Sequence, residues 1–287
     1  MAAINFLKSG FNQAISKFRL SVYLWLLIMA ISLIIIIPIS SQIRANLGHL
    51  SWSEKPLMPF ELNLMEIFLA SQNFLASYII FLLIMLLFSV ALSIFFRAGL
   101  FGQMLSQERS VTFRSFLADG CRYFCRFLLS LLLFIPFLLI FILLFNSLSA
   151  PLKLWSARAV SEWPVILAGL LCTLLLALLW TAFKLLLDLV RIFIVAESKK
   201  VIAAYASAFR FLSRHFFRLW GLYLLVSLAV IIISAIWLLI SRLFSPTQPG
   251  SLFILILLGQ AYILFRLFAR QVFIAVEYSY FSTRKDS

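Results

Sequence analysis

The side chains with the clearest chemical potential are charged residues that lie within long apolar segments. One segment carries a polar stripe in which successive members are three or four residues apart, which places them on one face of a helix: Thr173, Ala177, Thr181, Lys184, Asp188 and Arg191. Within it, Asp188 can reach Lys184 four residues earlier and Arg191 three residues later. A charge at bilayer depth costs about 2.5–3.5 kcal/mol on insertion scales, so such residues are expected to pair and to face protein.

Other apolar segments also carry cations near their ends, and together with the stripe they give five cations and one carboxylate: Arg97, Lys184, Asp188, Arg191, Arg266 and Arg270. The excess positive charge suits a phosphate, which arginine can bind through two parallel hydrogen bonds. We therefore predict that these six residues converge as a basic pocket for an anionic lipid headgroup. In the alternative, each cation extends separately to the headgroup region and only sets the topology.

Catalytic and metal-binding patterns do not occur in the sequence. The two histidines, His49 and His215, are expected on opposite sides of a membrane, and Glu61 and Glu66 would diverge on a helix. No zinc-protease motif, phosphate-binding glycine loop or nucleotide-binding lysine motif accompanies them. Three cysteines lack further ligands and are expected to be small buried thiols: Cys121, Cys125 and Cys172. We predict no catalytic residue, no metal and no cofactor.

The composition identifies the elements that must position the charged residues. The chain has 287 residues, of which 64% are hydrophobic and 12% charged. A soluble domain is about 45–50% apolar and about 25% charged, so a soluble globular enzyme and a disordered protein are both excluded. Since about 20 apolar residues cross the hydrocarbon core as a helix, the uncharged runs predict six spans at about 20–43, 73–97, 127–149, 164–190, 219–241 and 252–275.

Lysine and arginine are distributed unequally between the two predicted sides of the membrane. With Lys184 set aside within a span, 18 lie on one side and five on the other. Cytoplasmic loops carry the excess of these residues, so both termini are predicted to be cytoplasmic, as an even number of spans requires. The net charge of +14 follows from this asymmetry and from attraction to anionic lipid. No nucleic-acid motif accompanies it, so we predict no nucleic-acid partner.

Basic amphipathic stretches precede spans one, three and five. The clearest is 198–218, in which Arg210, Arg214 and Arg218 share one helical face and apolar residues occupy another. Residues 112–127, with Thr112 as a predicted N-cap, and residues 5–19 repeat the pattern. Such helices are expected to lie in the membrane interface. The predicted fold is an all-α polytopic membrane protein, with six transmembrane helices in one domain, 1–287, and an interfacial helix before each odd-numbered span.

Two segments carry a resemblance to known proteins: 113–127, with the sequence FRSFLADGCRYFCRF, and 187–197, with the sequence LDLVRIFIVAE, followed by the helix at 203–215. They resemble a class of uncharacterised bacterial six-span membrane proteins. The wider group is similar to the membrane domain fused to some glycerophosphodiester phosphodiesterases. The resemblance implies a multi-pass protein of the bacterial inner membrane. The spans fill the sequence and leave no room for the phosphodiesterase domain, so that activity is not carried over.

Three functions are compatible with these patterns. The first is a non-catalytic integral membrane protein, a partner or assembly component for another membrane protein, that binds anionic lipid at its cytoplasmic side. A transporter or lipid-handling permease subunit is the alternative, and it would need a cavity at mid-membrane and broken helices. Pro38 and Pro136 are the only prolines in the interior of the predicted spans. An intramembrane enzyme is the third.

Overall fold

The computed structural model describes residues 2–47, 72–106, 111–157, 161–244 and 249–284, and all regular elements in these ranges are helices. They are α1 (Ala2–Ser16), α2 (Arg19–Leu47), α4 (Gln72–Leu105), α5 (Phe113–Leu133), α6 (Ile135–Ala157), α7 (Trp163–Ala196), α8 (Val201–Arg242) and α9 (Pro249–Arg284). Six segments within the described ranges are helical, long and apolar enough to cross a membrane. The chain is therefore an all-α protein with six candidate transmembrane helices, as predicted.

The helix boundaries follow the predicted spans with one difference. Five of the predicted spans lie within α2, α4, α7, α8 and α9, whereas 127–149 begins in α5 and ends in α6. The chain turns at Phe134, whose N–H donates to the carbonyls of Ser130 and Leu131, both at 3.1 Å. Pro136 explains the turn, because it has no N–H with which to continue α5 but is tolerated in the first turn of α6.

Breaks also occur near the carboxyl ends of the other two amphipathic stretches. Lys17 and Phe18 form a turn between α1 and α2, and His215 interrupts α8 with φ −124° and ψ 15°. Thr112 is the N-cap of α5, as predicted, and its hydroxyl accepts from the N–H of Ser115 at 3.2 Å. The position of these three stretches in a membrane interface stays a prediction.

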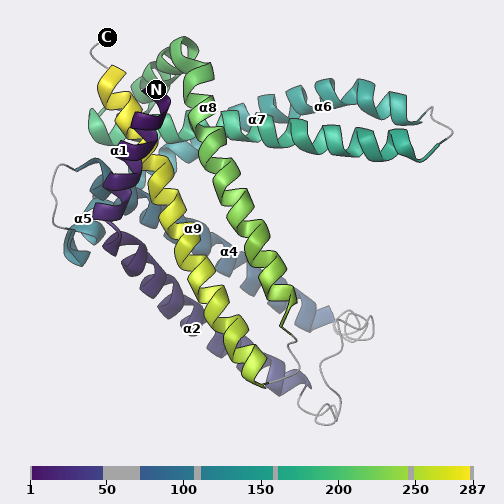
Figure 1. Ribbon diagram of the computed structural model, residues 1–287. Helices are drawn as coiled ribbons and strands as arrows, with labels where there is room; N and C mark the ends of the chain where they lie inside the picture. The colour runs from purple at the N-terminus through teal and green to yellow at the C-terminus, as the bar shows by residue number, and fades with distance from the viewer. Residues whose placement is uncertain (1, 48–71, 107–110, 158–160, 245–248, 285–287) are drawn as a thin grey trace.

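The buried core is concentrated at one end of the molecule. The ends of α4, α7 and α9 meet α1, α5 and the first half of α8 there, and buried side chains cluster within 94–105, 116–127, 185–194, 201–226 and 269–281. We call this region the junction. Away from it, the helices expose most of their large apolar side chains. Figure 1 shows both termini beside the junction and the α6–α7 hairpin pointing away from α2, α8 and α9.

Glycines permit close contact between α4 and α5. A Cβ on Gly99 would lie 2.7 Å from the carbonyl oxygen of Phe116, and one on Gly120 would lie 2.8 Å from the ring of Phe95. The buried face of α5 is consequently the face that covers α4, with Phe116, Gly120, Tyr123 and Phe127 along it. Its apolar stripe therefore covers protein within the junction.

The cysteines of α5 correct one expectation. Cys121 and Cys125 were expected to be buried thiols, but both are exposed, and Cys172 is half-buried. Cys121 follows the buried Gly120, and Cys125 lies two residues from both Tyr123 and Phe127. The rotation of the helix therefore places each cysteine outside the contact with α4.

Candidate functional site

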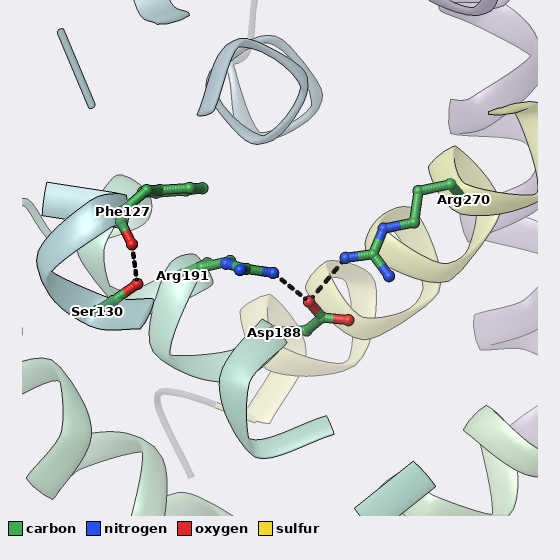
Figure 2. A network of polar contacts seen from close by, with 5 residues as sticks. All are labelled: Phe127, Ser130, Asp188, Arg191 and Arg270. Atoms are coloured by element: carbon green, nitrogen blue, oxygen red, sulfur yellow. Dashed lines mark hydrogen bonds and ion pairs between the residues drawn. The ribbon is translucent and has the colours of Figure 1, made fainter. Parts of the chain in front are cut away.

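Asp188 lies at the centre of a buried ion cluster in the junction. Its Oδ1 accepts from Nη1 of Arg191 at 3.1 Å and from Nη2 of Arg270 at 2.9 Å. Figure 2 shows the carboxylate between the two guanidinium groups, one from its own helix and one from α9. Asp188 is 1% exposed and Arg191 is 2% exposed. The carboxylate therefore fixes α9 against α7 where water does not weaken the ion pairs.

Arg191 also connects the cluster to α5. Its guanidinium carbon lies 5.6 Å from the ring centroid of Phe127, within the range of a cation–π contact. The neighbouring Ser130 donates to the Phe127 carbonyl at 2.7 Å, and its own carbonyl accepts from Tyr205 of α8 at 2.6 Å. Through Phe127 and Ser130, the cluster is therefore connected to Tyr205 of α8.

Two further cations lie within electrostatic range of Asp188 but form none of its ion pairs. Lys184 is half-buried, and its Nζ lies 5.5 Å from the ring centroids of both Tyr223 and Phe273. Arg97 is exposed and lies within electrostatic range of Asp188 and Arg270. Both side chains therefore add positive potential around Asp188 while remaining more accessible than Arg191.

Arg266 has a different environment from the other five predicted site residues. It is exposed, and its guanidinium carbon lies 6.0 Å from the ring centroid of Tyr262 on its own helix. It takes no part in the ion pairs of Asp188. The structure thus brings Asp188, Arg191 and Arg270 into direct contact, places Lys184 and Arg97 around them, and leaves Arg266 apart.

The polar stripe of α7 faces α8 as well as α9. Thr181 accepts from the indole N–H of Trp220 at 3.0 Å, one turn before Lys184 meets Tyr223 of α8. Each polar residue of this part of the stripe therefore meets a different neighbour. The stripe positions three helices relative to one another.

Glu277 belongs to the same region and was not among the predicted site residues. It is 4% exposed, and neither of its carboxylate oxygens has a hydrogen-bond partner within the described residues. Its carboxyl group lies within electrostatic range of Asp188, Arg270 and Lys184. Glu277 lies seven residues after Arg270, a spacing that returns to the same helical face and could have indicated its position.

A second buried polar network holds the end of α4, and sequence reasoning treated its lysine only as a topology signal. Lys17 is 5% exposed, and its Nζ donates to the carbonyls of Gln103 at 2.6 Å and Ser106 at 2.8 Å. The Gln103 amide in turn donates to Asp119 Oδ2 at 2.6 Å. A cation at the carboxyl end of a helix satisfies carbonyls that lack intrahelical partners. This network connects the turn between α1 and α2 with α4 and α5.

Within the described ranges, no group of three or more histidine, cysteine, aspartate or glutamate residues could hold a metal ion. His49, Glu61 and Glu66 lie outside those ranges. The chain matches no family model, no curated protein and no solved structure. The function must therefore be argued from the site itself.

Proposed function

We propose that this chain is a non-catalytic component of a bacterial inner membrane, with both termini cytoplasmic, that binds an anionic lipid headgroup beside Asp188. The observation that carries the proposal is the charge balance at the junction. Four cations, Arg97, Lys184, Arg191 and Arg270, share two carboxylates, those of Asp188 and Glu277. Since Arg191 and Arg270 are engaged with Asp188, Arg97 and Lys184 are the cations that a headgroup can reach.

Helix lengths support a position for this cluster at the inner boundary of the hydrocarbon. At 1.5 Å per residue, Asp188 lies roughly 38 Å from Trp163, the first residue of α7, whereas the hydrocarbon is about 30 Å thick. The same rise puts Arg97 about 38 Å from the start of α4 and Arg270 about 32 Å from the start of α9. Three helices thus carry their charges at the depth where lipid phosphates begin.

The amphipathic stretches fit the same placement. Phe11 and Ile15 of α1, and Ile202 and Phe209 of α8, remain exposed although a second face of each helix is buried in the junction. Apolar side chains beside basic residues favour the boundary between headgroups and acyl chains. We assign the protein no catalytic step, because the charges around Asp188 join helices. As a partner or assembly component, it would act through its contacts with lipid and with another membrane protein.

The test compares Arg97→Gln with Arg266→Gln in the full-length protein. Both arginines are exposed near the inner ends of apolar helices, but of the two only Arg97 lies within electrostatic range of Asp188. Native mass spectrometry of protein incubated with phosphatidylglycerol and phosphatidylcholine should show that Arg97→Gln lowers retention of phosphatidylglycerol and that Arg266→Gln does not. Equal losses would support separate interactions of each cation with headgroups. Equal retention in both variants would exclude a headgroup site beside Asp188.

A further inference from the structure

A second basic site lies on the opposite face of the α7 end, where it meets the first half of α8 and the end of α9. A cleft of about 660 Å³ opens there, within the range of small-molecule sites. Its lining contains four basic side chains and one acidic side chain: Lys199, Arg210, Arg214, Arg284 and Glu197. We call it the basic cleft. None of these residues belongs to the Asp188 cluster.

Three packed phenylalanines line the basic cleft. The ring centroid of Phe281 lies 4.9 Å from that of Phe193 and 5.6 Å from that of Phe211, and both pairs meet edge to face. The imidazole of His215 lies 5.0 Å from the ring of Phe211, at the break in α8. Because these rings fix one another through mutual packing, they form a rigid aromatic lining beside the basic side chains.

The basic side chains of the cleft differ in their contacts: Lys199 is paired within the protein, whereas Arg210 and Arg214 are exposed. Lys199 Nζ lies 2.7 Å from Glu197 Oε2 and donates to Ser207 Oγ at 2.8 Å, so the acidic side chain already has a cation beside it. Arg210 and Arg214 are exposed and stand one turn apart on α8. Two guanidinium groups on one helical face provide planar donors for a single phosphate. The site is therefore suited to a group with at least one negative charge and several acceptor oxygens.

An apolar cleft adjoins the basic cleft, and Arg210 lines both. It measures about 520 Å³, and Phe137 of α6, Leu186 of α7 and Phe209 of α8 line it. It lies where the α6–α7 hairpin diverges from α8 (Figure 1). A soluble phosphate ester would leave this apolar surface unused, whereas an amphiphile would cover it with an acyl chain.

We propose that the basic cleft binds the phosphate of an anionic phospholipid whose acyl chain lies in the apolar cleft beside Arg210. The ligand class is thus a diacyl lipid with a net negative headgroup. This inference extends the proposed lipid binding to a second site and does not depend on the site beside Asp188.

The test uses full-length protein in detergent, with phosphatidylglycerol, phosphatidylcholine and soluble glycerol phosphate as probes for native mass spectrometry. The double variant Arg210→Gln/Arg214→Gln should lose phosphatidylglycerol binding by about tenfold or more, because charge-assisted hydrogen bonds are the strong class. Arg218→Gln is the matched control, since Arg218 lies one turn further along α8 and does not line the cleft. Unchanged binding in the double variant, or an equal loss with Arg218→Gln, would overturn the proposal.

A second variant tests the source of the phosphate. Ala206→Trp fills the apolar cleft without changing any charge, so it should weaken phosphatidylglycerol binding while the thermal midpoint stays at the parent value. If glycerol phosphate displaces phosphatidylglycerol at comparable concentration, or if Ala206→Trp leaves lipid binding unchanged, the ligand is not a membrane lipid. Arg97→Gln should leave binding at this site intact, which separates failure here from failure of the site beside Asp188.

Discussion

The single carboxylate of Asp188 stabilises the junction by pairing with two arginines. A single oxygen accepts from arginines of two helices, and the buried Arg191 has its closest counter-charge there. Removing one partner of a buried ion pair leaves the remaining charge without compensation, which is far more costly than losing a surface pair. The resulting loss of stability can be measured by substituting Asp188 and, for comparison, Glu277.

We expect Asp188→Asn to destabilise the protein by about 3–5 kcal/mol, because the amide preserves the shape but removes the charged partner of the two guanidinium groups. Thermal or denaturant unfolding of the full chain in detergent would measure the loss. Glu277→Gln is the comparison, since Glu277 is equally buried yet has no hydrogen-bond partner within the described residues. Its smaller expected effect would show that the ion pairs, and not burial of a carboxylate alone, stabilise the junction. Equal losses would contradict this assignment.

Lys17→Met should destabilise the contact between α1 and α4, because the carbonyls of Gln103 and Ser106 lose a charged donor. Hydrogen bonds to charged groups contribute about 1.5–3 kcal/mol, so the free energy of unfolding should fall by a similar amount. Lys8→Met in the preceding helix α1 provides the control, since Lys8 is exposed. If both variants unfold at the same temperature, Lys17 is not a structural cap for α4.

Spacing along a helix predicted part of the site, and only the part that is local. The i to i+3 relation between Asp188 and Arg191 was available from the sequence, and the structure has that ion pair. Lys184, four residues earlier, instead meets the rings of Tyr223 and Phe273. The partnership with Arg270 spans 82 residues. Periodicity places side chains on faces, but it does not say which faces meet. The convergence of Arg270 with Asp188 was predicted from the level of their charges in the spans, whereas the contacts of Lys184 with the two rings were not.

At the scale of elements, α4 and α5 form a pair whose separation depends on glycine. Gly99→Ala should destabilise it by about 1–3 kcal/mol, because the added Cβ meets the Phe116 carbonyl, a backbone atom that cannot rotate away. Gly169→Ala in α7 is the matched control, since its Cβ would enter open space and alanine is the better helix former. Thermal unfolding should therefore shift in opposite directions for the two variants. A shift in the same direction would contradict the close contact.

Hydropathy predicted the helices better than it predicted their packing. Long uncharged runs predicted six spans, and the described residues contain six helical segments of sufficient length and apolarity. The turn at Phe134 was not placed, because the apolar run continues through it and only Pro136 marks it. Likewise, the apolar stripe of α5 was expected to face lipid, although it covers α4. Lipid and protein interiors select the same apolar residues, so a stripe alone does not distinguish them.

For the whole molecule, the termini are the most direct test of orientation. The first and last helices pack side by side, and both termini lie beside the junction (Figure 1). We expect a green fluorescent protein fused after Ser287 to fluoresce and an alkaline phosphatase at the same position to be inactive. The physical reason is the excess of lysine and arginine on the side that holds both ends. Active phosphatase would reverse the predicted orientation and would place both proposed lipid sites in the opposite leaflet.

The contact between α1 and α9 also has a consequence for biosynthesis. Gly10 lies against the backbone of Val276, so α1 packs against a helix, α9, that is synthesised much later. Asp188 likewise enters the membrane long before Arg270 is translated. Until α9 is synthesised, Asp188 has only Arg191 of its two arginine partners, and the face of α1 that packs on α9 has no partner helix. Membrane insertion of the earlier helices therefore precedes their final assembly, and a chain truncated before α9 should be held by the insertion machinery or degraded.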